Sequence, residues 1–454
     1  MDFNTKAVAT ARELLEFIDK SPSCYHAIDN IKDYLSDYTE LKEEDSWELT
    51  PGQGYYVVRN SSSIIAFRIP ESADNASFGG FRIAATHSDS PVFKLKPNAE
   101  MEVDKKYIRL NTEKYGGMIL STWLDRPLSI AGRVFAEKKG HIQELHINLD
   151  KDLLIIPNVA VHLNRDSADG VKLNPQIDML PLYACATPDN KEATTGSLMS
   201  IIAEEAEVNE ESIFGSDLFI YNRARGTFLG PDNELIASRA LDNLQCTYGV
   251  LKGFLDSVMT SGDKKEDTNT AKSGFNNPND IPVFCVFDNE EVGSLTKQGA
   301  DSTFLIDTLS RISKLITGSD DYLRQAFSKS FMISADNAHA LHPNHSELSD
   351  PTNKPYINGG VVIKYNANQK YTTDGQSEAY LRLLCKKAAV PVQTYTNRSN
   401  IAGGSTLGNL SSAHVSVSTV DIGLPQLAMH SSYETAGTYD TQYLIQLMKV
   451  FYSI

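Results

Sequence analysis

Apolar residues recur at helical spacing near the start of the chain. The spacing of three to four positions predicts an amphipathic helix, and it is formed by Val8, Ala11, Leu14, Leu15 and Ile18. A Ser-Pro-Ser sequence at 21–23 follows. Such residues stop a helix, so we expect the first helix to end there.

Short, mostly apolar runs appear further along and are predicted to be strands. They lie at 64–67, 81–85, 283–287, 331–333 and 415–422. Helical spacing returns between the late runs, at 241–255 and 304–316. This alternation of strands and helices is typical of an α/β fold built around a central sheet.

The segment from about 91 to 232 has a different pattern of polar and apolar residues. Short strands with alternating polarity, such as 132–136 and 141–149, are separated there by many turn residues. We expect this segment to form a separate β-rich domain. The stretch 257–280 lacks apolar periodicity and is predicted to be a surface loop.

Length and composition agree with two domains. The chain has 454 residues, of which 41% are hydrophobic, which is too long for one ordinary core. Its 42 Lys and Arg against 58 Asp and Glu give a formal net charge of −16. That charge repels phosphate backbones and anionic lipid surfaces. We therefore expect neither a nucleic-acid partner nor a membrane partner.

The chain also carries no recognisable targeting or membrane signal. No run approaches the roughly 18 apolar residues that span a bilayer, and the first 17 residues are broken by charges. The five cysteines are far apart and show no C-x-x-C spacing. We expect them to be reduced and buried, in a soluble cytoplasmic enzyme.

Polar residues follow several of the predicted strands, at the sheet edge where α/β proteins gather ligands. His87 closes the run at 81–85, and Asp89 lies two positions further on. Histidine is a metal ligand, and a nearby carboxylate can fix its tautomer. A single histidine near a turn is more often structural, so this interpretation needs partners from elsewhere in the chain.

Two glutamates follow the run at 283–287. Adjacent residues that leave a strand point to opposite sides. One of Glu290 and Glu291 can therefore bind a metal ion while the other approaches the activated water. The alternative is a solvated acidic turn.

Three further candidates come from other places in the sequence. Asp336 lies just beyond the run at 331–333, and His430 follows the hydrophobic segment at 415–422. Asp242 opens the predicted helix at 241–255, where an acidic residue also favours the helix dipole. Together these side chains form a mixed nitrogen and oxygen ligand set without thiolate. Such a set suits zinc, cobalt or manganese.

A cluster of three histidines is a weaker candidate. His339, His342 and His345 are spaced three apart, which suggests a site made of histidine alone. Pro343 interrupts the helix that would align them. We interpret them as lining the substrate or supporting the site, with purely structural roles as the alternative.

Seven blocks, in order, resemble the aspartyl aminopeptidase and vacuolar aminopeptidase I family of dinuclear metalloaminopeptidases. The likeness runs almost from end to end of the chain. The blocks are SPSCYH at 21–26, THSDSP at 86–91, IPNVAVH at 156–162, LDN at 241–243, DNEEVGS at 288–294, SADNAHALHPN at 334–344 and QLAMHS at 426–431.

The resemblance implies two divalent metal ions, with zinc as the expected metal and cobalt or manganese as alternatives. It assigns the ligands as His87 and Asp336 on one ion, Glu291 and His430 on the other, and Asp242 bridging both.

The resemblance also assigns the residues that act on protons. Glu290 would be the general base, taking a proton from the attacking water and giving it to the leaving amine. Asp89 would orient His87.

The same resemblance implies the architecture. A three-layer α/β catalytic domain with a central mixed sheet, residues 1–92 and 234–454, would be interrupted by an inserted β-rich dimerisation domain, residues 93–233. Family members form dodecameric shells from dimers. His162 matches a histidine that reaches the active site of a neighbouring subunit.

The substrate side is less defined. Lys364 and Tyr371 lie in segments that resemble the substrate-binding side of the family, and Lys364 is a cation for an acidic side chain or a solvated strand lysine. The loop at 400–408 carries Asn400 and the pair Ala402 and Gly403, where relatives have an acidic residue and Pro-Cys. Preference for N-terminal Asp and Glu, or for a broader neutral set, therefore stays open.

These observations predict a metalloaminopeptidase acting on peptides. One alternative is a related dinuclear deacylase or carboxypeptidase, which would process N-acetylated substrates. Another is a non-catalytic peptide-binding shell. The presence of Glu290 and of all five ligands argues against that last reading.

Overall fold

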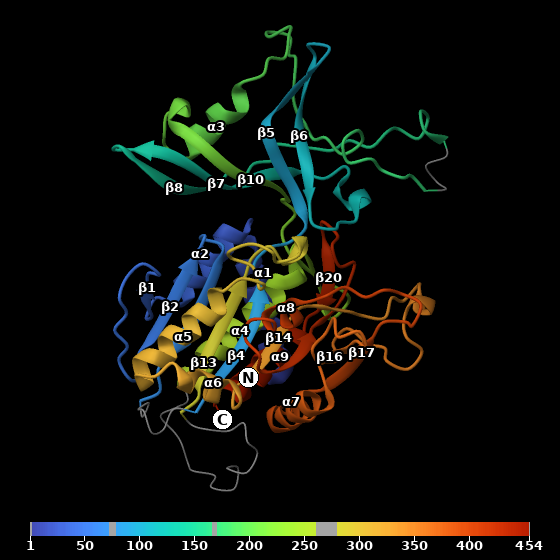
Figure 1. Cartoon of the computed structure of the whole chain (residues 1–454). Helices are drawn as coiled ribbons and strands as arrows, with labels where there is room; N and C mark the ends of the chain where they lie inside the picture. Colours follow the sequence, from blue (N-terminus) through green and yellow to red (C-terminus); the bar gives the residue numbers. More distant parts are fainter. Residues whose placement is uncertain (1, 72–78, 166–169, 260–278, 454) are drawn as a thin grey trace.

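The computed structural model describes residues 2–71, 79–165, 170–259 and 279–453. The chain forms an α/β body and, stacked on it, a β-rich region made of residues 92–222 (Figure 1). Most of the loop expected at 257–280 lies outside the described residues. Its first three positions, 257–259, belong to helix α4 (Leu241–Met259) instead.

A nine-stranded mixed sheet runs through the body. Its strands, in spatial order, are β1 (Thr39–Leu41), β2 (Gly54–Arg59), β3 (Ser63–Arg68), β13 (Ile281–Phe287), β4 (Phe81–His87), β14 (Phe331–Ala335), β18 (Ser418–Gly423), β16 (Val361–Tyr365) and β17 (Val392–Thr396). The central four strands, β13, β4, β14 and β18, are parallel. Strands β3 and β16 pair with this centre in antiparallel fashion. The carboxyl ends of the four central strands therefore meet at one edge.

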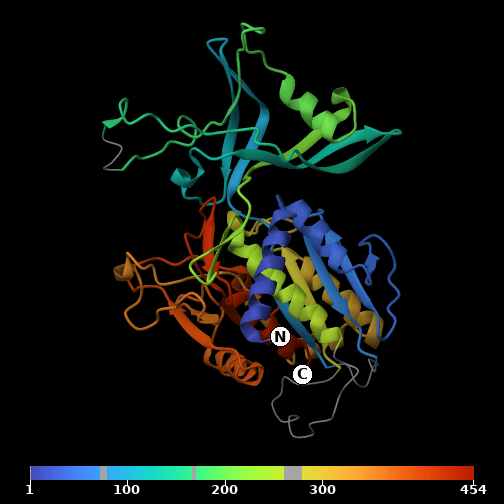
Figure 2. The same cartoon turned by 180° about the vertical axis from the view of Figure 1, so that it is seen from behind.

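Helices cover both faces of this sheet. One face packs against α1 (Phe3–Asp19), α2 (Cys24–Tyr34), α4, α7 (Gly375–Ala388) and α9 (Asp440–Ser453). The other packs against α5 (Phe304–Thr317), α6 (Asp321–Phe327) and α8 (Leu407–Ser411). Figure 2 shows α1 and α4 lying side by side across the first face.

Alternation along the strands explains the two cores. In β4, Ala84 is buried under α1 and α4, while Ile83 and Ala85 are buried under α5. Successive side chains of a strand point to opposite faces, so a wholly apolar strand needs helices on both sides. The three-layer α/β fold expected from the sequence is confirmed.

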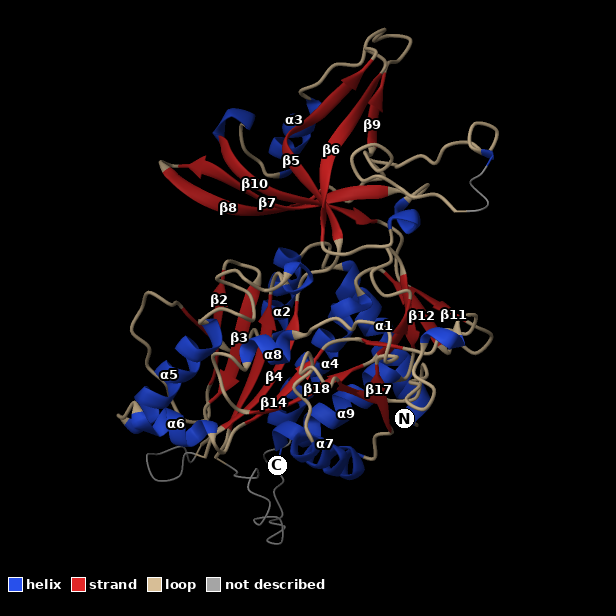
Figure 3. Cartoon of the chain, turned by 45° about the vertical axis from the view of Figure 1, so that its right-hand side comes forward, coloured by secondary structure: helices blue, strands red, loops and turns tan. Residues whose placement is uncertain are grey.

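The β-rich region has its own antiparallel sheet and core. The spatial order is β8 (His141–Asn148), β7 (Leu128–Lys138), β10 (Ile213–Asn222), β5 (Val92–Val103), β6 (Tyr107–Tyr115) and β9 (Leu182–Cys185). Helix α3 (Ser197–Glu205) and the short 3-10 helices η1 (Leu120–Trp123) and η3 (Glu210–Ser212) complete it. Phe93, Trp123 and Ile130 are among its buried core residues. Figure 3 shows this sheet standing above the body.

A third, five-stranded sheet was not expected. It contains β11 (Thr227–Leu229), β12 (Leu235–Ser238), β20 (Glu434–Gly437), β19 (Pro425–Leu427) and β15 (Ala338–His339). Strands of two to four residues are too short to show a period in the sequence. β11 and β12 follow the β-rich region in the sequence, whereas β15, β19 and β20 belong to the C-terminal part of the body.

Two expectations need correction. Cys185 is exposed, whereas the other four cysteines are buried as predicted. It is the last residue of β9, an edge strand that pairs with β6 on one side only within the sheet. The apolar run at 415–422 begins its strand only at Ser418, because the residues before it form the turn after α8.

No helix among the described residues is both long enough and apolar enough to cross a membrane.

His146 links the β-rich region to the body. Its ring on β8 contacts Asp29 of α2 through Nδ1 and Glu144 through Nε2, and the ring of His26 lies 5.8 Å from it. Partial burial lowers the pKa of His146, but the two carboxylates outweigh this effect and raise it from 6.5 to about 9. A charged imidazole therefore holds the two parts together at neutral pH.

We expect replacement of His146 by Gln to lower the free energy of unfolding by about 1–2 kcal/mol at pH 6. Because the pKa is raised in the folded protein, this contribution is complete below pH 6.5 and is lost as the pH rises through about 9. Denaturant unfolding of the variant and the unchanged protein should therefore converge near about pH 10. His141→Gln, an exposed position on the same strand, is the control. A difference in unfolding free energy that does not change with pH would contradict the role of the charged His146 imidazole.

Candidate metal centre

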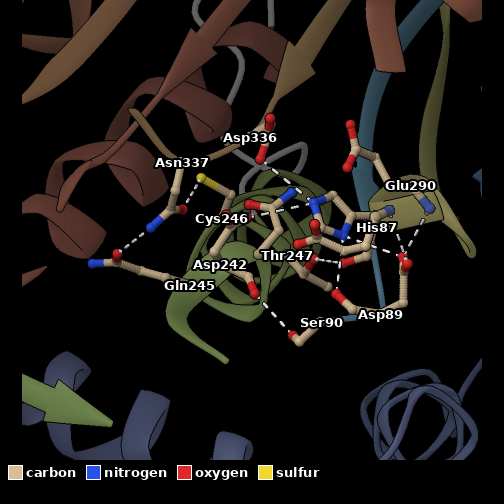
Figure 4. Close-up of polar contacts among 12 residues, drawn as sticks. His87, Asp89, Ser90, Asp242, Gln245, Cys246, Thr247, Glu290, Asp336 and Asn337 are labelled. Carbon is tan, nitrogen blue, oxygen red and sulfur yellow. Dashed lines mark hydrogen bonds and ion pairs between the residues drawn. The ribbon is translucent and has the colours of Figure 1, made fainter. Parts of the chain in front are cut away.

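Three neighbouring parallel strands end beside one another and carry candidate ligands. His87 is the last residue of β4 and stands opposite Phe287, the last residue of β13. Glu290 and Glu291 follow β13, and Asp336 follows β14. The strand-end interpretation therefore matches the geometry for these four side chains, of which Figure 4 labels His87, Glu290 and Asp336.

The remaining two candidates come from the five-stranded sheet. Asp242 lies four residues beyond β12, and His430 lies in the turn between β19 and β20. Asp242 does not occupy a helical turn as expected, because its φ of −81° and ψ of 106° are non-helical. Regular helix in α4 begins only after Asn243. The extended backbone directs the Asp242 carboxylate toward the strand ends.

The carboxylate of Asp242 stands between two imidazoles. Its Oδ1 is 3.5 Å from Nε2 of His87, and its Oδ2 is 3.4 Å from Nε2 of His430. On the first side, Asp336 Oδ1 is 3.4 Å from the same His87 nitrogen. On the second, Glu291 Oε2 is 3.2 Å from the His430 nitrogen. Among the described residues, these contacts define two ligand groups that share Asp242.

The donor set fits divalent cations. Asp242 Oδ1 and Glu291 Oε1 are buried oxygens that accept no hydrogen bond. A buried carboxylate oxygen without a partner is costly. Imidazole and carboxylate donors without thiolate are those that zinc, cobalt and manganese accept. Metal ions bound between these side chains would satisfy both oxygens.

The pKa values of the side chains in the centre are shifted by burial and by the nearby carboxylates. Burial lowers the pKa of His87, but Asp242, Asp336 and Asp89 raise it well above its ordinary value. Burial and then the charge of Asp242 raise the pKa of Glu291. Burial likewise raises the pKa of Glu290 to about 8, where nearby carboxylates add to the effect and His87 opposes it. Several carboxylates therefore compete for little positive charge.

Asp89 connects His87 to the two glutamates. Its backbone oxygen lies 3.1 Å from Nδ1 of His87, and its Oδ1 lies 3.3 Å from the same nitrogen. Its side chain also accepts the backbone N–H groups of Glu290 and Glu291, each at 3.1 Å. Asp89 therefore fixes the ring of His87 and the position of the glutamate turn together.

The glutamates are presented by a different local structure from the one expected. They lie in the 3-10 helix η5 (Glu290–Val292) rather than on an extended strand. Asn289, immediately before it, adopts the left-handed conformation with φ of 60°. Tight turning, and not strand alternation, therefore separates the directions of the two side chains.

Glu434 was missed by sequence reasoning. It is buried, its Oε2 accepts the N–H of Asp242 at 3.0 Å, and its Oε1 accepts the N–H of His430 at 2.7 Å. It therefore holds the backbone of the shared ligand and of one terminal ligand. It acts through main-chain groups, so neither spacing nor residue type pointed to it.

A buried polar network continues from Glu434 beneath the centre. Gln426 donates to Glu434 at 3.4 Å and accepts from Asn337 at 2.6 Å. Asn337 follows Asp336 directly, and its side chain also donates to Gln245 of α4 at 2.9 Å. These hydrogen bonds connect Asn337, next to Asp336, to Glu434. Figure 4 shows the contact between Asn337 and Gln245.

The structure places the residues predicted to bind the substrate at or near Asp336. Lys364 is buried, and its Nζ lies 3.2 Å from Asp336 Oδ2 and 3.1 Å from the carbonyl of Asn337. Tyr371 is buried next to it, with Nζ 5.4 Å from the ring centre. His339, on β15, has its ring 5.8 Å from that of Tyr395.

The other predicted histidines lie away from this cluster. His342 and His345 follow β15 in an exposed loop, with ring centres 5.1 Å apart, so no continuous helix aligns them with His339. His162 lies in an exposed turn of the β-rich region. None of these three belongs to the ligand groups found among the described residues.

The chain is similar to known proteins over nearly its whole length. The family described as aminopeptidase I zinc metalloprotease (M18) matches residues 17–452. A probable M18 family aminopeptidase 2 from Clostridium novyi is 42% identical over 448 residues, covering 98% of both chains.

Solved structures share the fold. A chain in the structure of the Ape4 and Nbr1 complex is 34% identical, with a TM-score of 0.89, over 99% of this chain and 86% of that one. The mApe1 dodecamer of S. cerevisiae is 24% identical, with a TM-score of 0.82, over 97% of this chain and 95% of that one.

We expect Glu434→Gln to weaken metal binding by about 10- to 100-fold. An amide nitrogen cannot accept a hydrogen bond, so the N–H of either Asp242 or His430 loses its acceptor. Calorimetric titration of metal-free protein with zinc measures the effect. Glu378→Gln, which removes a surface pair with Arg382, is the control. Zinc affinity equal to that of the unchanged protein would contradict this role.

Proposed function

The chain belongs to the M18 family of zinc metalloaminopeptidases, and we propose that it removes N-terminal residues from peptides with two divalent ions. The observation that carries the proposal is the placement of Asp242, whose two oxygens face separate imidazoles at 3.5 and 3.4 Å. Family membership favours this activity over a deacylase, a carboxypeptidase or a non-catalytic shell.

The proposed ligand assignment follows the two groups around Asp242. One ion would be held by His87 and Asp336, and the other by Glu291 and His430, with Asp242 shared. Zinc is the expected metal because the family is one of zinc metalloproteases. Ions bound there would lower the pKa of a water molecule and polarise the scissile carbonyl.

Glu290 is the proposed general base. Its carboxylate lies within 4.8 Å of the ligand atoms of His87 and Glu291, beside the centre. A carboxylate in this place takes a proton from the attacking water and delivers it to the leaving amine. Asp89 contributes by holding the backbone of Glu290 through a 3.1 Å hydrogen bond.

Lys364, Tyr371 and His339 are proposed to contact the N-terminal residue of the substrate. Lys364 is the charged member of this set, and its ammonium is already paired with Asp336 at 3.2 Å. The charge that it offers to an acidic side chain is therefore shared. We infer a modest preference for N-terminal Asp or Glu over neutral residues.

We also propose that residues 93–233 form an inserted dimerisation domain and that twelve chains assemble into a shell. The turn around His162 carries the exposed apolar side chains Val159, Val161 and Leu163, at 55, 59 and 84% exposure. Apolar side chains in such a cluster are typical of a protein interface. The yeast relative with the same fold is a dodecamer. His162 would then approach the centre of a neighbouring chain.

We expect Glu290→Gln to lower kcat by about 10²- to 10⁴-fold, because the amide cannot accept the proton. Release of free amino acids from unblocked peptides measures this, and a chelator should abolish the activity of the unchanged protein. The zinc affinity of this variant, measured by titration, should stay within about tenfold of that of the unchanged protein, since Glu290 is not a proposed ligand. Glu347→Gln, an exposed position, is the control. Activity retained by Glu290→Gln would exclude its role as base.

A panel of aminoacyl amides should reveal the modest acidic preference. An unshared hydrogen bond to a charged group contributes about 1.5–3 kcal/mol. With Lys364 shared, we expect kcat/KM for Asp and Glu amides to exceed that for Ala and Leu amides by less than about tenfold. Preference above a hundredfold would show that another group recognises the acidic side chain.

A further inference from the structure

One segment of the β-rich region runs along the candidate metal centre. This segment, residues 115–122, leaves β6 and continues into η1. The N–H of Ile119 donates to the carbonyl of His430 at 3.0 Å. A Cβ atom at Gly116, where φ is +77°, would lie 3.1 Å from Cβ of Glu291, and one at Gly117 would lie 3.8 Å from Nδ1 of His430. The segment therefore touches two of the proposed ligands closely.

Tyr115, at the start of this segment, is bonded to the turn that carries the glutamates. Its hydroxyl donates to Oδ2 of Asp89 at 2.7 Å and accepts from Nδ2 of Asn289 at 2.8 Å. The same Asp89 oxygen accepts the N–H of Glu291 at 3.1 Å. One phenol oxygen thus joins both supports of the η5 turn.

The end of the segment holds the His430 turn in the same manner. The hydroxyl of Thr122 accepts the N–H of Ser432 at 2.9 Å, and Ser432 Oγ donates to the carbonyl of Thr122 at 2.6 Å. Both turns that carry the second ligand pair, Glu291 and His430, are therefore attached to the 115–122 segment.

The two halves of the centre are supported differently. His87 and Asp336 stand at the ends of β4 and β14, which are hydrogen-bonded to each other inside the body sheet. Glu291 and His430 lie on turns, and a turn is positioned by its outside contacts rather than by a ladder. Loss of the Tyr115 hydroxyl should disturb the second half more than the first, because Asp89 approaches His87 through its backbone oxygen and its Oδ1, whereas Tyr115 contacts its Oδ2.

We propose that Tyr115 is a positioning residue that sets the affinity of the ion held by Glu291 and His430. The inference rests on the proposed two-ion function and goes beyond it by assigning the β-rich region a part in one half of the centre. Tyr115 itself touches neither substrate nor ion. It acts through Asp89 and Asn289, which fix the backbone of the η5 turn.

The test is a titration of metal-free Tyr115→Phe with Co²⁺, followed by calorimetry and by the visible absorption of the bound ion. We expect one binding event within about twofold of the unchanged protein and a second weakened by about 10- to 100-fold. A purely structural role would lower the melting temperature without separating the two affinities.

Tyr221→Phe is the matched control. It removes a phenolic hydroxyl from β10 of the same region, where that hydroxyl donates to Asn148 Oδ1 at 2.8 Å. Both of its Co²⁺ affinities should stay unchanged. Gly116→Ala is a second, independent variant, because its new methyl group would press on Glu291. It should weaken the same binding event as Tyr115→Phe.

Two other results of the Co²⁺ titrations would contradict the proposals. Two unchanged affinities in Tyr115→Phe, or an equal loss in both, would overturn the positioning role while leaving the two-ion centre intact. An unchanged protein that binds fewer than two Co²⁺ ions would overturn the proposed function and this inference with it.

Discussion

Burial of several carboxylates close together is the constraint on which the rest of the structure depends. Asp242, Glu291 and Asp336 converge there with two imidazoles, and Glu290 lies beside them. Charges without partners in a protein interior are strongly unfavourable. The raised pKa of Glu291 and the two oxygens without hydrogen-bond partners express that conflict directly. Bound cations resolve it, provided that the scaffold prevents the carboxylates from moving apart.

The scaffold meets this requirement from three directions. The parallel strands of the body sheet fix His87 and Asp336. The five-stranded sheet brings in Asp242 and His430, whose N–H groups share the carboxylate of Glu434. The 115–122 segment of the β-rich region braces the remaining turns. The chain passes through that region between residues 87 and 242, so the interruption of the body places a support against the centre.

The sequence predicted those parts of the centre that depend on regular structure. Apolar strands followed by polar residues located His87, Glu291 and Asp336, because the carboxyl ends of parallel strands meet at one edge. Asp242 and His430 were candidates by residue type and by their places after a predicted helix start and a hydrophobic segment. The strands around them are too short to show a period, so which ion each would hold came only from the family resemblance.

Residues that only support the ligands through hydrogen bonds could not be found in this way. Glu434 and Tyr115 bind backbone groups or other supporting side chains, and neither task demands a recognisable spacing. The alternating polarity along short strands did indicate the β-rich region. The contact of that region with the metal centre depends on tertiary packing, which the pattern does not report. Composition and periodicity report burial and local structure, while such contacts join residues far apart in the sequence.

Charge balance gives a further reason to prefer two ions over one. The four carboxylates of Asp242, Glu290, Glu291 and Asp336 carry four negative charges when ionised, and Lys364 supplies one positive charge beside Asp336. One divalent cation leaves this group net negative, which would repel the negative charge that develops on a carbonyl oxygen during hydrolysis. Two leave it net positive, or neutral when the carboxylate of Asp89 beside His87 is counted as well, so the developing charge is not repelled. The buried pair of Lys364 and Asp336 therefore bears on the whole centre as well as on substrate preference.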